Sequence, residues 1–174
     1  MKTADIERAV VIKMFPPTRY ITIPNVSWSF FVWHESDLIA LSDAGYAYEV
    51  EIKRTKSDLI ADKKKQRWSL PSYRNKRIPL SNLIKSMWFA GPQEMESDLL
   101  EHAQPFAGVI TVEEKEPTWQ NPLDGVKIYR CHIIRKPKVN PDHIKWDAEK
   151  RNQLLRLAYL RFTEQRWNIR SRQC

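Results

Sequence analysis

Residues 37–53 read DLIALSDAGYAYEVEIK, and this stretch decides the fold. It contains two short apolar segments, Asp37–Leu41 and Tyr46–Lys53, joined by a turn sequence that ends in Gly45. Glycine adopts the backbone conformation that a tight turn requires, and both flanking segments are rich in residues that favour strands. The stretch therefore predicts a β-hairpin.

The second strand of this hairpin alternates charged and apolar side chains. Successive side chains of a strand point to opposite faces, so Glu49, Glu51 and Lys53 share one face. The apolar residues between them are expected in the core, which leaves the charged row on a half-buried strand. Asp37 on the first strand is then expected to lie across from the Glu51 region.

A pair of carboxylates held on adjacent strands needs neutralising. At about 4 Å and an effective dielectric of about 20, two such charges repel by roughly 4 kcal/mol. A bound cation usually neutralises such a pair, and a site with only oxygen ligands favours Mg²⁺ or Mn²⁺ over Zn²⁺. The alternative is that these are ordinary solvated side chains on one face of a hairpin. The pattern alone leaves both interpretations open.

The rest of the chain alternates helix and strand patterns. Helices are expected at 3–14, 57–65, 94–103 and 140–170, and extended segments at 20–33, 83–90, 106–112 and 126–134. Pro16 and Pro17 end the first helix, and Asn140-Pro141-Asp142 is expected to open the last. This order predicts a mixed α/β domain.

Composition excludes several classes of protein. The apolar fraction of 42% is enough for a sizeable core, and no apolar run approaches the roughly 20 residues that cross a bilayer. The N-terminal residues carry charges among their apolar positions, unlike a signal peptide. Two cysteines make no disulfide framework, and four glycines make no phosphate-binding loop. A reducing, cytoplasmic location without membrane contact is expected.

The basic surplus is concentrated in one segment. The formal charge is +8, and a surplus of Lys and Arg favours binding to the phosphates of nucleic acids. The basic residues between positions 53 and 77 are Lys53, Arg54, Lys56, Lys63, Lys64, Lys65, Arg67, Arg74, Lys76 and Arg77. The lysines at 63–65 are either phosphate contacts or a solvated helix end, and the sequence leaves both readings open.

Asp37, an apolar strand, a turn and then Glu51-Ile52-Lys53 resemble the PD-(D/E)XK nuclease superfamily, which has the restriction-endonuclease-like fold. The stretch KRTKSDLIADKK at 53–64 is similar to the helix that follows this strand in MmcB-like DNA repair proteins, and the core also looks like that of Holliday-junction resolvases. The later stretches MWFAGP at 87–92 and PFAGVI at 105–110 resemble the group's later core strands. The resemblance covers residues 3–112, and Ser36 stands where a proline often precedes the first aspartate.

The resemblance implies a role for each residue. Asp37 and Glu51, with the carbonyl of Ile52, would hold Mg²⁺ or Mn²⁺ against the scissile phosphate, and Lys53 would orient the attacking water or stabilise developing charge. Glu35 and Glu49 are second-tier candidates, which either contact a metal-bound water or are merely exposed, and Glu7 is the candidate for the helix-borne glutamate of many members. The expected DNA-binding residues are Lys56, Lys63, Lys64, Lys65 and Arg67.

We therefore expect a restriction-endonuclease-like mixed sheet flanked by helices in residues 1–138 and a basic C-terminal helix in residues 139–174. The expected function is metal-dependent hydrolysis of DNA phosphodiester bonds in repair, recombination or phage DNA processing. The alternative is an inactive nuclease fold that binds DNA, or a phage-type accessory protein. Three interpretations of the C-terminal helix stay open: a second DNA-facing surface, the arm of a homodimer, or a solvated amphipathic helix, of which the last is slightly favoured.

Overall fold

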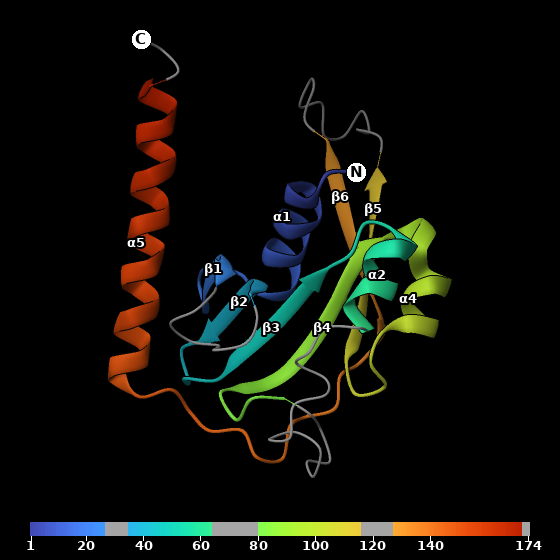
Figure 1. The fold of residues 1–174 in the computed structure, drawn as a ribbon, viewed down its shortest axis with the longest axis horizontal. Helices are drawn as coiled ribbons and strands as arrows, with labels where there is room; N and C mark the ends of the chain where they lie inside the picture. Colours follow the sequence, from blue (N-terminus) through green and yellow to red (C-terminus); the bar gives the residue numbers. More distant parts are fainter. Residues whose placement is uncertain (27–34, 64–79, 116–126, 172–174) are drawn as a thin grey trace.

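The computed structural model describes residues 1–26, 35–63, 80–115 and 127–171, with side chains up to 163 in the last segment. Six strands form one sheet in the order β1-β2-β3-β4-β5-β6 (Figure 1). Their bounds are β1 Tyr20–Val26, β2 Ser36–Ser42, β3 Ala47–Ile52, β4 Ile84–Pro92, β5 Gly108–Lys115 and β6 Ile128–Arg135.

The direction of pairing changes at β3. β1, β2 and β3 pair antiparallel, whereas β4 runs parallel to β3 and β5 runs parallel to β4; β6 returns antiparallel to β5. Parallel neighbours need a crossover connection. The first crossover contains α2 (Lys56–Lys63), and the second contains the short helix η2 (Gln93–Met95) and α4 (Glu96–His102). The chain therefore leaves the sheet for its first crossover directly after β3.

Helices cover both faces of the sheet. On one face the helix α1 (Thr3–Met14) buries Ile6, Ala9 and Val10 against Leu38 and other apolar residues of the strands. The opposite face packs under α2, α4 and the first turns of α5 (Ala148–Ser171), a helix that lies beside β1 at the edge of the sheet (Figure 1). Both faces of the central strands are therefore buried.

The expected mixed α/β fold, with a sheet flanked by helices and a C-terminal helix, is confirmed. The first helix has the bounds that the sequence predicts, and the hairpin of residues 37–53 forms around Gly45, which has a φ of 88°. None of the described helices combines the length and apolar character needed to cross a bilayer.

The start of the last helix is corrected by the structure. The predicted helix at 140–170 begins only at Ala148, because the preceding segment is anchored at the start of β4 in a non-helical conformation. The Asn140 side-chain amide donates to the carbonyls of Ser81 and Ile84, and the Trp146 indole donates to the carbonyl of Leu83. Tertiary hydrogen bonds thus override the local helix-start signal of residues 140–142.

Candidate active site

The end of β3 and the start of β2 lie side by side. Leu38 pairs with Val50, so the next position outward places Asp37 opposite Glu51 on the same face of the sheet. The Asp37 carboxylate also accepts a hydrogen bond of 2.7 Å from the backbone N–H of Ile52. This bond holds Asp37 between the two charged residues of the Glu51-Ile52-Lys53 sequence.

The Lys53 ammonium lies between two buried carboxylates. Its Nζ atom is 2.7 Å from Glu51 Oε2 and 3.2 Å from Asp62 Oδ1. The exposed fractions of the three side chains are 7%, 1% and 3%, so water screens these charges weakly. The charged row of β3 is therefore buried and not half-buried as the sequence predicts, because α2 and α4 cover this face.

Gly91 of β4 allows the backbone of Lys53 to approach β4 closely. The Lys53 N–H donates to the carbonyl of Ala90, which carries the β3–β4 contact one residue past the end of β3. A Cβ atom at Gly91 would lie 2.7 Å from the Lys53 carbonyl oxygen, closer than real Cβ contacts come. The absence of a side chain at position 91 thus sets how closely Lys53 approaches β4.

Burial and neighbouring carboxylates shift the pKa values of two groups, Lys53 and Glu7. Burial works against the charge on Lys53, but Glu51, Asp62 and more weakly Asp37 outweigh it and raise the pKa of the ammonium. Lys53 is therefore a cation at neutral pH and acts as a charge, not as a base. On α1, burial and then the negative charge of Asp37 raise the pKa of Glu7, which places this carboxyl within the field of Asp37.

The donor set fits a hard divalent cation. Asp37, Glu51 and Asp62 all act electrostatically on Lys53, so three carboxyl groups surround one ammonium. Asp37 and Glu51 offer oxygen ligands from adjacent strands, the type that Mg²⁺ and Mn²⁺ prefer. The sequence-derived ligand pair is thus on one face, which a metal ion shared between them requires.

The remaining predicted residues lie outside this cluster. Glu35 is exposed just before β2. Lys56, expected on DNA, has its ammonium 2.8 Å from Asp98 of α4, with 54% of its side chain exposed. The side chain of Lys63 and all of Lys64, Lys65 and Arg67 fall outside the described residues.

Asp62 and Glu49 are buried acids near the end of β3; sequence reasoning missed Asp62 and named Glu49 only as a second-tier candidate, to contact a metal-bound water or to lie exposed. Asp62 is 2% exposed and Glu49 is 1% exposed. A signal for Asp62 was present, because it follows the buried Leu59 by three positions and so lies on the inner side of the same helix. Glu49 is opposite Ile39 of β2 and next to Met87 of β4, which continues the acidic row into the core.

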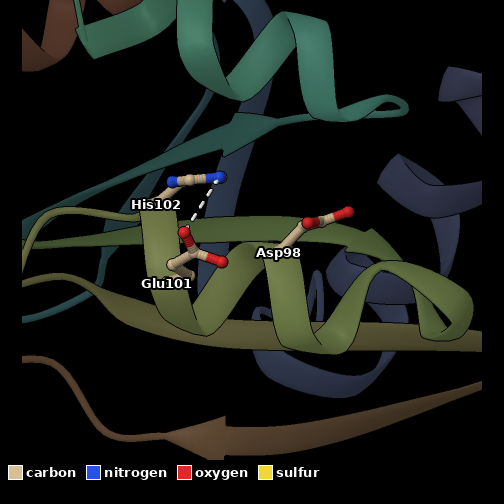
Figure 2. Close-up of side chains that lie close together, drawn as sticks. All are labelled: Asp98, Glu101 and His102. Carbon is tan, nitrogen blue, oxygen red and sulfur yellow. Dashed lines mark ion pairs between the residues drawn. The ribbon is translucent and has the colours of Figure 1, made fainter.

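A second group of possible ligands lies on α4. The possible ligand atoms of Asp98, Glu101 and His102 lie within 4.8 Å of one another. Figure 2 shows that all three side chains come from this helix. His102 Nε2 is 3.7 Å from Glu101 Oε1, and the Glu101 side chain is 68% exposed. Because Asp98 pairs with Lys56 and Glu101 lies in solvent, the group is explained as surface charge.

No family model matches the chain, and no curated protein matches it either. Among solved structures, the chain is similar to a protein of unknown function from Silicibacter pomeroyi, with a TM-score of 0.58 and 13% identity. The match covers 99% of this chain and 94% of the other. At this identity the likeness concerns the fold alone.

Proposed function

We propose that the protein is a Mg²⁺- or Mn²⁺-dependent deoxyribonuclease of the PD-(D/E)XK type. One observation carries the proposal: the Asp37 carboxylate accepts the backbone N–H of Ile52, between Glu51 and the buried ammonium of Lys53. This is the arrangement that the Asp…Glu-x-Lys resemblance implies. The antiparallel β2–β3 hairpin supports the same proposal, because it brings the start of β2 and the end of β3 to the same end of the sheet.

In this proposal each residue of the chain has a separate task. Asp37 and Glu51 bind the metal, with the carbonyl of Ile52 as a third oxygen. When bound, the metal supplies Lewis acidity at the phosphate and lowers the pKa of water towards neutrality. Lys53 stays protonated and stabilises negative charge on the phosphate oxygens, which requires a fixed cation in a site with little water.

DNA is the partner that the charge supports. The chain carries a formal charge of +8, and its basic residues follow the site directly in sequence, from Lys53 to Arg77. Lysine and arginine in such a segment bind phosphates without regard to base sequence. A cytoplasmic location belongs to the same proposal.

A DNA-binding module without cleavage is the second candidate. The observation that favours it is the Glu51–Lys53 ion pair, which engages the metal-binding carboxylate of β3 within the protein itself. If this pair never opens, Glu51 is not available as a ligand and the fold retains only its DNA affinity.

Nuclease assays separate these candidates. Supercoiled plasmid, linear duplex, single strands and four-way junctions are incubated with Mg²⁺, with Mn²⁺ or with EDTA. Cleavage that EDTA abolishes, and that Asp37→Ala and Glu51→Ala each remove while DNA affinity persists, is the expected result. Metal-dependent cleavage that is equal in wild type and both variants would refute the assigned site.

Glu101→Gln is the matched control for this assay. It removes a carboxylate from the other possible ligand group, on α4, and leaves the end of β3 untouched. The proposed site predicts unchanged cleavage by Glu101→Gln. Loss of activity in this variant alone would move the metal to α4 and contradict the proposal.

A further inference from the structure

The second partner of Lys53 is not part of the Asp…Glu-x-Lys pattern. Asp62 lies in the last turn of α2, and its Oδ1 atom is 3.2 Å from the Lys53 ammonium. A carboxylate in the last turn of a helix is opposed by the partial negative charge of the helix C-terminus. With only 2% of the residue exposed, burial opposes its charge as well. The helix dipole and burial both disfavour a charged carboxylate at Asp62, and the ion pair with Lys53 compensates for this cost.

The position of α2 makes this contact rigid. Leu59 is 1% exposed and packs in the main core one turn before Asp62, so the same side of the helix carries both residues to the sheet. Asp58 fixes the other end of α2, because its carboxylate accepts hydrogen bonds from the backbone N–H groups of Thr55 and Arg54. The connection from Lys53 to Asp62 is thus short and held at both ends.

We infer that Asp62 is a positioning residue, which keeps the Lys53 ammonium in the site when the Glu51 carboxylate binds a metal ion. The inference rests on the proposed function. Glu51 is the nearer partner of Lys53, at 2.7 Å, and the same carboxylate is a proposed metal ligand. Lys53 and the metal therefore compete for Glu51, and Asp62 offers the ammonium an alternative acceptor of equal charge without moving it out of the site.

Metal affinity measures this competition directly. Binding of Mn²⁺ is followed by the loss of the electron paramagnetic resonance signal of free Mn²⁺, in the absence of DNA. Asp62→Asn leaves Lys53 with Glu51 as its carboxylate partner, so the Kd for Mn²⁺ is expected to rise by about tenfold, as for other residues that orient a metal ligand. Asp58→Asn is the control, because it removes an exposed charge from the same helix, while the amide oxygen of asparagine still accepts the N–H groups of Thr55 and Arg54. This control is expected to bind Mn²⁺ as wild type does.

A double substitution separates positioning from a merely structural role. In a Lys53→Met background no ammonium competes for Glu51, so adding Asp62→Asn is expected to change the Kd for Mn²⁺ by less than about twofold. A wild-type Kd in Asp62→Asn, or the same loss of affinity with and without Lys53, would overturn the inference while leaving the metal site intact. Wild-type protein that binds Mn²⁺ no better than Asp37→Asn would instead refute the proposed function.

A measurement on the wild-type chain covers the case in which Asp62→Asn does not fold. The ¹⁵Nζ signal of Lys53, assigned by its loss in Lys53→Met, is recorded before and after saturation with Ca²⁺. Retention by Asp62 predicts that the signal remains and still exchanges slowly with water. Its disappearance into rapid exchange on Ca²⁺ binding would show that Asp62 does not hold the ammonium.

Discussion

Replacing Lys53 by methionine tests the buried ion pairs of the site. Methionine has a similar length and no charge, so the change leaves the carboxylates of Glu51 and Asp62 without the ammonium that lies 2.7 and 3.2 Å away. Removing one partner of a buried pair costs about 3–5 kcal/mol, because the remaining charge stays out of water. Domains of this size are stable by about 5–15 kcal/mol, so the loss is a large fraction of the total.

Urea unfolding in EDTA measures this loss. With an m-value of about 2 kcal/mol per molar, the midpoint for Lys53→Met is expected to fall by about 2 M urea. The raised pKa of Lys53 means that the contribution is fully present at neutral pH and is lost only as the pH rises through the folded-state value. Unfolding at pH 7 therefore reports the whole effect.

Lys56→Met is the matched control. Lys56 forms an ion pair of nearly the same length with Asp98, at 2.8 Å, but 54% of its side chain is exposed. Water screens such a pair, so its midpoint is expected to stay close to that of wild type. If Lys53→Met and Lys56→Met unfold at the same urea concentration, the ammonium of Lys53 is not held among buried charges and the description of the site is wrong.

Three further predictions concern pH, thiol reactivity and salt. Burial and Asp37 raise the pKa of Glu7, so wild-type stability falls as the pH rises from the ordinary pKa of 4.5 through the raised value. Glu7→Gln should therefore melt at a higher temperature than wild type at pH 7 and lose this advantage below pH 4.5, and a lower melting temperature at pH 7 would contradict this. Burial raises the pKa of Cys131 to about 11, so in Cys174→Ser protein the thiol should react with a disulfide reagent at pH 8 roughly 100-fold more slowly than an ordinary cysteine. Replacing the basic residues of segment 63–67 by Gln should flatten the plot of log K for DNA against log[salt] by about 0.9 per lost phosphate contact, whereas an unchanged slope removes the segment from the binding surface.

Local sequence patterns were enough to predict most helices and strands of the fold. Pro16 and Pro17 mark the end of α1, Gly45 marks the hairpin turn, and the alternation of residues 47–52 predicts β3. These signals depend on neighbours in the chain, so they can be read without the structure. The strands after β3 were predicted at nearly their observed positions for the same reason.

Long-range contacts decided what the sequence did not predict. Asn140 and Trp146 bond to backbone groups near β4 that lie more than 50 positions away, and these bonds keep residues 140–147 out of the helix. The burial of Glu49 depends on helices that return to the same face after β3 and β4. Asp62 reaches Lys53 only because α2 folds back over the end of β3. Each case needs the tertiary arrangement and not a local pattern.

Anomalous diffraction from crystals soaked in Mn²⁺, recorded at the manganese absorption edge, tests the proposed metal site most directly. The site predicts an anomalous peak between the carboxylates of Asp37 and Glu51, the two acids one position beyond the Leu38–Val50 pair of β2 and β3. The peak should vanish in Glu51→Gln crystals soaked in the same way. An empty map between Asp37 and Glu51, with manganese bound instead at Asp98, Glu101 and His102 of α4, would contradict the assignment.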